Sequence, residues 1–390
     1  MTSADTWTCP SPFNVADRAQ LFIDRLLVRK AENLCFTLHP ATKHPANPLV
    51  KVDRPWEGWR LEIYGSVIYD EDEKLFKMWY LCDAPGYFEC SVPTCYAVSQ
   101  DGIHWEKPLV GTAKSPKFDN HNVVLGDAHL ASVFKDAADP DPSRRYKMVC
   151  WDMTHGRYET RVSPDGIHWT KYGPERISPG GDVITALWDP YRQLYIAFPK
   201  IGTNVRGFNR RVFYVITSRD FLEWSEPRPA FFPDLQDDAG TLARLEEVRP
   251  LLDVPDDPRL MRTEFYGVGA YAHESCVIAF PWVFTINNNR RSGGNQEGPS
   301  EVQIAVSRDL VEWHRPFREP CILRGKVGEW DCGWFCTAAS ALRVGDEIWL
   351  YYQGSNYTHG TPCLYEAQDT GRLTKYTSSI GLAVWKLDRF

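Results

Sequence analysis

Residues 97–105 read Ala-Val-Ser-Gln-Asp-Gly-Ile-His-Trp, and the same phrase returns three more times along the chain. The copy at residues 161–169 keeps Val-Ser-x-Asp-Gly-Ile-His-Trp, whereas those at residues 216–224 and 305–313 keep Ser-x-Asp and the final Trp. Asp and Gly favour a tight turn, and a tryptophan at a fixed distance can pack between neighbouring sheets. A repeated turn with a fixed aromatic residue predicts a repeated supersecondary unit, so the fold is expected to be an array of similar sheets.

Apolar segments of strand length precede each copy of the phrase. In the first unit they are residues 64–69, 75–81 and 95–99. A fifth unit lacks the phrase but keeps the plan, with residues 380–388 in the place of the marked strand. Five antiparallel sheets in series, with almost no helical periodicity, predict an all-β fold: one five-bladed β-propeller domain over residues 1–390. The blades are expected at roughly 55–107, 120–171, 180–226, 260–315 and 329–388.

Three features fall outside this plan or compete with it. A pair of β-sandwiches is the alternative architecture, although it explains the repeats poorly. Residues 20–30 include the strand-like run Leu-Phe-Ile-Asp-Arg-Leu-Leu-Val, which is expected to complete the last blade and close the ring, because an open sheet edge invites aggregation. Residues 231–257 fit no blade and indicate a short helix.

Composition narrows the function classes. The chain has 44 basic and 51 acidic residues, a net charge of −7, which does not favour a nucleic-acid partner. It has no apolar run of about 18 residues, so no membrane span is expected, and its start lacks the features of a secretory signal. The 11 cysteines form no regular framework, which favours reduced thiols and a cytoplasmic location. Cys332 with Cys336, and Cys90 with Cys95, lack further ligands at zinc-site spacing, so no metal is assigned to them.

Candidate site residues follow from the geometry of a propeller, in which the innermost strands line the axis and their entrance ends meet. Polar residues just before these strands are poorly placed for packing and well placed for a ligand. Blade two offers His129 or Asp127 at this position. The other four blades each offer an acid, and these are the candidate catalytic residues: Glu62, Asp182, Glu264 and Asp331.

Several acids at one opening suit the cleavage of a glycosidic bond. That reaction needs one carboxylic acid to protonate the leaving oxygen and one ionised carboxylate to activate water or attack carbon. Crowding acids together raises the pKa of at least one of them. The competing interpretation is that these acids cap turns or pair with Arg60, Arg262 and Arg324.

Residues beside the acids are candidates for substrate binding. Tryptophans suit the apolar face of a sugar ring, although packing between blades is the competing explanation, and arginines can hold hydroxyl or anionic groups. The candidates are Trp56, Trp59, Arg60, His129, Arg262, Tyr266, Trp330 and Trp334.

Five phrases together resemble a known group of proteins. They are Pro-Trp-Glu-Gly at 55–58, Lys-Met-Trp-Tyr at 77–80, Asp-Gly-Ile-His-Trp at 101–105, Arg-Tyr-Lys-Met at 145–148 and Ser-Arg-Asp-x-x-x-Trp at 307–313. Over roughly residues 20–390 the chain resembles the bacterial five-bladed proteins described as similar to family 32 and family 43 glycoside hydrolases. The resemblance implies Glu264 as general acid, Asp182 as the residue that orients it and tunes its pKa, and Glu62 or Asp331 as base or nucleophile. Glu62 stands where the furanosidases of that clan have an Asp in blade one.

The expected function is therefore a glycoside hydrolase that acts on small glycosides or oligosaccharides, with a small carbohydrate as its partner. A glycoside phosphorylase on the same scaffold would need a phosphate-binding cluster, for which Arg206, Arg210 and Arg211 are candidates. A non-catalytic carbohydrate-binding propeller would have its acids paired with arginines. No cofactor is expected; oxygen ligands converging on the axis would suit a calcium ion near His129, and this remains an alternative.

Overall fold

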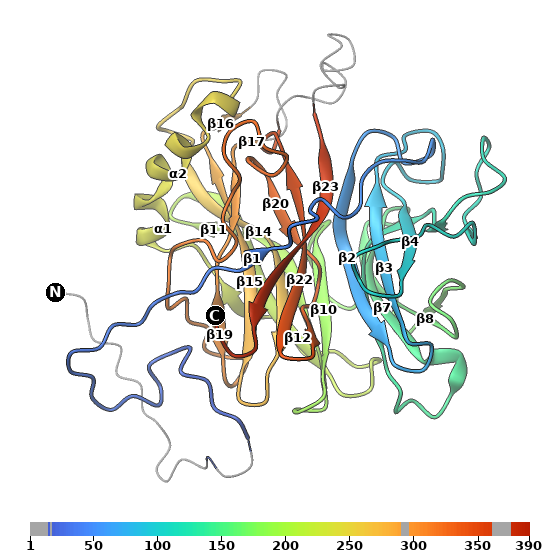
Figure 1. The fold of residues 1–390 in the computed structure, drawn as a ribbon, viewed down its shortest axis with the longest axis horizontal. Coiled ribbons are helices and arrows are strands. Elements are labelled where there is room, and N and C mark those ends of the chain that lie inside the picture. The colour runs from blue at the N-terminus through green and yellow to red at the C-terminus, as the bar shows by residue number, and fades with distance from the viewer. Residues whose placement is uncertain (1–14, 16–17, 290–295, 361–375) are drawn as a thin grey trace.

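The computed structural model describes residues 15, 18–289, 296–360 and 376–390, and within these the chain forms five antiparallel sheets around a common axis (Figure 1). The prediction of an all-β, five-bladed propeller is confirmed. Part of the expected fifth blade, residues 361–375, lies outside the described residues.

Each blade runs from an inner strand at the axis to an outer strand at the rim, and in blades one to three the strands follow one another in sequence. Blade one contains β2 (Leu61–Asp70), β3 (Leu75–Cys82), β4 (Thr94–Ser99) and β5 (Val123–Leu125). Blade two contains β6 (Ala128–Lys135), β7 (Tyr146–Asp152), β8 (Arg157–Ser163) and β9 (Thr170–Tyr172). Blade three contains β10 (Ile184–Asp189), β11 (Leu194–Val205), β12 (Phe208–Ser218) and β13 (Arg228–Phe231).

Blade four contains β14 (Arg262–Ala272), β15 (Val277–Ile286), β18 (Ser300–Val302) and β19 (Ala305–Ser307), with a small ribbon of β16 (Asn288–Asn289) and β17 (Gln296–Glu297). Blade five contains β20 (Phe335–Thr337), β21 (Leu342–Val344), β22 (Glu347–Ser355), β23 (Ser378–Lys386) and β1 (Thr42–Lys43). The inner strands lie against one another in a closed circle, in the order β2, β6, β10, β14, β20 and back to β2. One boundary differs from expectation: β5, assigned from the sequence to blade two, is the outer strand of blade one.

The ring closes through the N-terminal part of the chain, as expected, but through a different segment. Strand β1 pairs with β23, Thr42 opposite Val384, and no strand forms within residues 20–30. The apolar residues of that run are used elsewhere, because Leu21 and Ile23 are buried in the hydrophobic core while Asp24 pairs with Arg308 of blade four. The expectation for residues 20–30 was therefore wrong in position.

The repeated phrase forms the same turn in all four blades that carry it. In the first copy Ser99 Oγ accepts from the backbone N–H of Gly102, and Asp101 Oδ1 accepts from the backbone N–H groups of Ile103 and His104, each at 2.8–2.9 Å. The glycine carbonyl then accepts from the preceding blade: Tyr351 of blade five donates to Gly102 O at 2.7 Å. Each turn is therefore an inter-blade contact as well as a hairpin.

Two of the four turns place a larger residue at the glycine position. Phe221 and Leu310 adopt φ of 65° and 62°, a left-handed conformation that costs a non-glycine residue roughly 1 kcal/mol or more. Both side chains are buried, which offsets that strain by removing apolar area from water. The indole nitrogens of Trp224 and Trp313 in these turns have no hydrogen-bond partner among the described residues, whereas Trp105 donates to Gly102 O at 3.0 Å.

At the end of the inner strands near these turns, buried ion pairs join neighbouring blades. We call two such groups the seam clusters: Asp70, Lys77 and Tyr146, and Asp136, Lys147 and Tyr195. Lys77 Nζ lies 2.7 Å from the Tyr146 hydroxyl and 3.1 Å from Asp70, and Tyr146 donates to Asp70. The second cluster repeats this pattern between blades two and three, with Tyr195 donating to Asp136.

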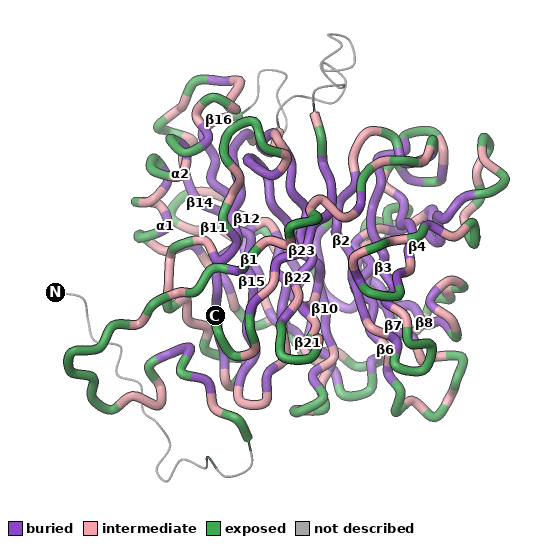
Figure 2. Tube along the Cα trace, viewed as in Figure 1, coloured by how far each residue is buried: buried purple, intermediate pink, exposed green. Residues whose placement is uncertain are grey.

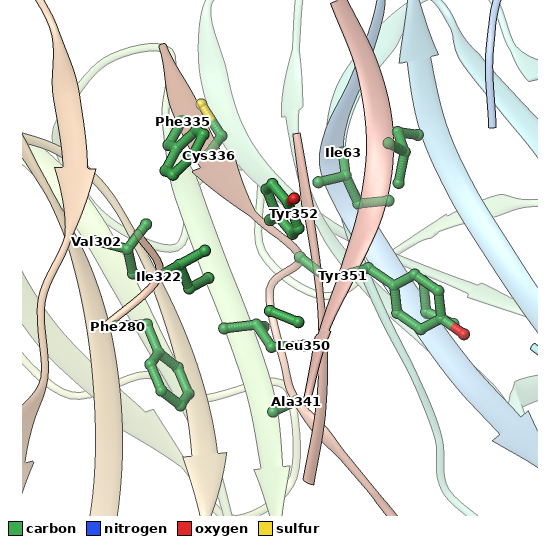
Figure 3. Packing of buried hydrophobic residues seen from close by; sticks show 14 of the residues in the cluster. Ile63, Phe280, Val302, Ile322, Phe335, Cys336, Ala341, Leu350, Tyr351 and Tyr352 are labelled. Carbon is green, nitrogen blue, oxygen red and sulfur yellow. The ribbon is translucent and has the colours of Figure 1, made fainter. Parts of the chain in front are cut away.

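Buried residues follow the strands and exposed residues the loops (Figure 2). The largest apolar cluster spans blades one, four and five, and Figure 3 shows part of it around Phe335, Leu350 and Tyr352. Residues 231–257 contain the expected helix as two short ones, α1 (Leu235–Ala239) and α2 (Thr241–Glu247), followed by a 3₁₀ turn at Arg249–Leu251; another 3₁₀ turn lies at Pro142–Arg144 in blade two. None of the helices in the described part of the chain is long and apolar enough to cross a bilayer.

Candidate active site

The entrance ends of the inner strands are irregular in three blades. The pairing register shifts between Glu62 and Ser66 in β2, between His129 and Ser132 in β6, and between Phe265 and Val268 in β14. A bulge at this place re-aims side chains and ends regular pairing, and bulges are common beside active sites. Side chains from all five blades gather at this end, and we call them the axial cluster: Arg60, Glu62, His129, Asp182, Lys200, Arg211, Glu264, Tyr266 and His359.

Glu62 is the acid that blade one contributes. It is 8% exposed, and its Oε1 accepts from Arg60 Nη1 at 2.7 Å. Burial raises the pKa of Glu62; the positive charge of Arg60 opposes this effect and the negative charge of Asp83 adds to it. A carboxyl group in this setting holds its proton to higher pH than an exposed glutamic acid.

Asp182 lies between blades two and three and has a different environment. Its side chain is 56% exposed and pairs with Lys200 of β11, and its backbone carbonyl lies 3.3 Å from His129 Nε2. Its φ of 53° is left-handed, a strained conformation for a residue other than glycine, and such strain clusters at functional sites. Burial lowers the pKa of His129 to about 4, so His129 is neutral near pH 7.

Glu264 of β14 is held by two arginines. It is 1% exposed, accepts from Arg262 Nε at 2.7 Å and from Arg211 Nη1 at 2.6 Å, and lies 3.3 Å from the Arg211 backbone N–H. Glu264 therefore fixes the guanidinium groups of Arg262 and Arg211 beside the axis.

Tyr266 and His359 form the centre of the cluster. His359 Nδ1 lies 2.7 Å from the carbonyl oxygen of Gln296, so this nitrogen must carry the proton and donate. The Tyr266 hydroxyl, 3.2 Å away, then donates to the free electron pair on Nε2. Burial, reinforced by the charges of Arg211, Lys200 and Arg60, lowers the pKa of His359 to about 3. Burial and the charge of Asp182, with a smaller effect from Glu62, raise the pKa of Tyr266.

Lys200 is the least expected member of the cluster. Its ammonium group pairs with Asp182 and lies 4.7 Å from the centre of the Tyr266 ring. Burial lowers its pKa; Asp182 opposes that effect and Arg211 adds to it. The cluster therefore interleaves cations and carboxylates around a neutral tyrosine and histidine.

Three candidates from the sequence do not join this cluster. The Asp331 side chain faces Lys43 at 2.6 Å and the Tyr352 hydroxyl at 2.8 Å, away from the axial residues, and Trp330 packs on the same tyrosine. Trp56 is buried, and its indole N–H donates to Asn122 at 2.7 Å, as a packing residue does. Trp59, Arg60, Arg262 and Trp334 do lie at or beside the cluster. Of the arginines considered for phosphate, Arg211 lies in the cluster, whereas Arg206 and Arg210 bind Asp238 of α1.

Sequence reasoning missed Lys200, His359 and Asp83. Lys200 comes from a second strand and His359 from the residues after β22, whereas the predicted positions all lie at the start of inner strands. Alternation along β11 could have placed Lys200 on one face, but nothing in the sequence marks His359. In the described part of the chain, no three His, Cys, Asp or Glu side chains gather as a metal site requires, and the calcium site stays a prediction.

No protein-family profile matches the chain, and no curated protein sequence matches it. Solved structures do match over nearly the whole length. A glycosyl hydrolase from Bacteroides ovatus is 13% identical, with 90% of this chain and 94% of that chain covered and a TM-score of 0.53. A thermostable family-43 glycoside hydrolase is 12% identical, with 86% and 94% covered and a TM-score of 0.52. A third structure is described with the GH130 family of mannoside phosphorylases, which contains glycoside hydrolases that target β-1,2 mannosidic linkages in Candida mannan. It is 14% identical, with 92% and 96% covered and a TM-score of 0.52.

These likenesses establish the fold. The chain shares the five-bladed propeller of these carbohydrate-active proteins, as the resemblance in its sequence motifs implied. At such low identity they say nothing about individual site residues, so the chemistry has to be argued from the axial cluster itself.

Proposed function

We propose that the protein is a glycoside hydrolase whose axial cluster cleaves a glycosidic bond. One observation carries the proposal: two acids of the axial cluster have different environments, because Glu62 is buried beside Arg60 whereas Asp182 is exposed beside Lys200. Glycoside cleavage needs such a pair, one carboxyl group that keeps its proton and one that stays ionised. The similar structures named above, two of them described as glycoside hydrolases, support this choice of reaction at the level of the fold.

Glu62 is the proposed general acid. Its raised pKa keeps it protonated to higher pH than an exposed glutamic acid, so it is suited to give its proton to the glycosidic oxygen as the bond between that oxygen and the anomeric carbon breaks. Arg60, which binds Glu62 in the free protein, stabilises the carboxylate that this proton transfer leaves behind.

Asp182 is the proposed partner carboxylate. It is the most exposed of the three axial acids, and its side chain pairs with the ammonium group of Lys200. It either takes a proton from the water that attacks the anomeric carbon, which inverts the configuration, or attacks that carbon itself, which retains it. Proton NMR of the first product formed distinguishes the two outcomes.

Glu264 takes a different role from the one that the sequence resemblance implied. Arg262 donates to one of its carboxyl oxygens and Arg211 donates to the other, so both oxygens already accept from protein donors. We therefore assign Glu264 to the positioning of Arg211, whose remaining donors can meet substrate hydroxyl groups.

The substrate is proposed to be a small carbohydrate that stacks on the aromatic residues of blades one and five. Trp59 and Tyr357 have ring centres 5.6 Å apart, with the Arg60 guanidinium over the Trp59 ring. Sugar rings bind such faces through their apolar side. The cysteines of the described part are free thiols, which supports the cytoplasmic location expected from the sequence.

A panel of aryl furanosides and pyranosides between about pH 5 and pH 8 tests the reaction. Hydrolysis of at least one member, lost in both Glu62→Gln and Asp182→Asn, is the expected result. Turnover that requires inorganic phosphate and yields a sugar phosphate would replace the hydrolase with the phosphorylase.

A non-catalytic carbohydrate-binding propeller is the second candidate, because each axial acid is paired with a cation: Glu62 with Arg60, Asp182 with Lys200, and Glu264 with two arginines. Calorimetry with the same sugars separates the two functions. Binding without hydrolysis of any panel member would select the second candidate.

A further inference from the structure

Asp83 directly follows β3 and receives contacts from two residues beside the axial cluster. Its side chain is buried, the Trp59 indole N–H donates to its Oδ2, and Arg60 Nε lies 3.8 Å from the same oxygen. Arg60 in turn donates to Glu62 at 2.7 Å. One carboxylate therefore touches both the aromatic residue and the guanidinium that border the proposed general acid.

The backbone of Asp83 fixes the loop that carries these residues. Gly58 has φ of 70°, and a Cβ at that position would lie 1.6 Å from the Asp83 carbonyl oxygen, so only glycine allows the loop to approach this closely. The Asp83 backbone N–H donates to Glu57 O at 3.2 Å. The loop thus rests on Asp83 through backbone and side-chain contacts together.

The other side of the loop is held by a buried acid. Glu57 is fully buried and accepts from Lys107 and from the Tyr80 hydroxyl, each at 2.7 Å. Its second oxygen accepts from the backbone N–H groups of Asp53 and Arg54. With Glu57 anchoring the start of the loop, Asp83 is left to set the positions of Trp59 and Arg60 at its end.

We propose that Asp83 is a positioning residue of the axial site, which holds Trp59 as a sugar-binding surface and aims Arg60 at Glu62. The inference rests on the proposed function for its catalytic consequence, and on geometry alone for the placement of Trp59 and Arg60. Arg60 contacts both Asp83 and Glu62. The negative charge of Asp83 therefore offsets part of the effect by which Arg60 lowers the pKa of Glu62.

The charges that face Glu62 allow this effect to be isolated. From blade one they are Arg60, which lowers the pKa of Glu62, and Asp83, which raises it, and the amide of Gln353 in blade five also lowers it. Neutral groups that ionise only at high pH complete the surroundings: Tyr64, Tyr266, Cys336 and Tyr357. Asp83 is thus the negatively charged member of this set, so its removal is expected to lower the pKa of Glu62.

Asp83→Asn tests the proposal, because it removes the charge and keeps an acceptor for the Trp59 indole. We expect the pKa of Glu62, followed by carbon NMR of labelled glutamate carboxyl groups, to fall by roughly one unit. The alkaline limb of the kcat/KM profile should move down by the same amount, which is about a 10-fold loss at pH values above that limb. Asp72→Asn is the matched control, an exposed acid of the same blade that pairs with Lys135 at the opposite end, and it should move neither.

Nitrogen NMR supplies a measurement that needs neither substrate nor a folded Asp83 variant. The indole N–H of Trp59, assigned with Trp59→Phe, should exchange with solvent at least about 10-fold more slowly than an exposed indole, because Asp83 accepts from it. Free exchange of this hydrogen, or a Glu62 pKa that Asp83→Asn leaves unchanged, would overturn the proposal. A shifted Glu62 pKa in a protein that hydrolyses no glycoside would support the positioning role and reject the proposed function.

Discussion

Buried acids and cations occur at both ends of the inner strands, but the pKa shifts of these groups differ between the two ends. At the seam end, burial alone would raise the pKa of Asp70, but hydrogen bonds from Lys135, Tyr146 and Lys77 lower it below its ordinary range. At the entrance end burial prevails, raising the pKa of Glu62 and lowering those of Lys200 and His359. A buried carboxylate whose oxygens all accept hydrogen bonds stabilises the fold. A buried carboxyl group with fewer such partners keeps a shifted pKa and is able to take part in acid–base catalysis.

The largest expected effect is a loss of activity in variants at the entrance end of the inner strands. Glu62→Gln and Asp182→Asn should each lower kcat by at least about 10²-fold, the usual contribution of an acid–base group. Both variants should melt within a few degrees of the unsubstituted protein, because the amide keeps the shape of the carboxyl group and neither acid belongs to a seam cluster. Steady-state kinetics with the best panel substrate, beside calorimetric melting, measures both quantities. Near-normal rates in both variants would remove these residues from the reaction.

The next effect is on stability and lies at the other end. Asp70→Asn leaves Lys77 and Lys135 without their shared carboxylate, and breaking a buried ion pair on one side costs about 3–5 kcal/mol. The free energy of unfolding in urea should fall by that amount, with kcat per folded molecule unchanged. A fall in kcat as large as that of Glu62→Gln would contradict the division of roles between the two ends.

The dependence of stability on pH should carry opposite signs from the two ends. Asp70, Asp136 and Asp139 have lowered pKa values, for Asp139 to about 2 because hydrogen bonds from Lys147, Asp141 and Arg144 outweigh its burial. Their contribution to stability is present above the unfolded value of about 4 and is lost as pH falls toward about 2. Glu62, with a raised pKa, contributes stability below about pH 4 that is lost as pH rises through its folded value.

Urea unfolding as a function of pH checks these signs. Asp70→Asn should flatten the loss of stability below about pH 4, and Glu62→Gln should flatten the decline above it. An unchanged slope in either variant would show that the group does not titrate as assigned.

The smallest expected effect concerns Asp331, the candidate acid that lies outside the axial cluster. Asp331→Asn should change kcat/KM by less than about 3-fold, because Asp331 contacts Lys43 and Tyr352 in place of the axial residues. Loss of the ion pair should still lower the unfolding free energy by about 1–3 kcal/mol. A drop in kcat comparable to that of Asp182→Asn would return Asp331 to the site.

The fold could be predicted because its signal repeats. Each Ser-x-Asp turn depends on contacts within a few residues, such as Asp101 with Ile103 and His104, so one sequence phrase fixes one local structure. Ring closure by residues 42–43 was hidden, because two paired residues leave almost no pattern. The apolar run at 21–28 gave a stronger signal for a strand, yet its side chains serve the core.

The site was predictable only where it follows the strand order. Glu62, Asp182 and Glu264 were found because they precede or begin inner strands, but the same rule selected Asp331, whose side chain turns toward β1. Lys200, His359 and Asp83 enter from second strands and connecting segments, where no local pattern marks them. The pKa values of the individual acids could not be predicted, since they depend on which cation from another part of the ring lies beside each acid.

The pairing of β1 with β23 also has a consequence for how the chain folds during its synthesis. Thr42 and Lys43 leave the ribosome long before their partners Val384 and Ala383. Until β20, β22 and β23 are synthesised, the first and fourth blades have no fifth blade between them, and His359 has not joined the axial cluster. The nascent chain therefore carries two uncovered sheet faces until this segment docks, and the axial cluster can be complete only afterwards.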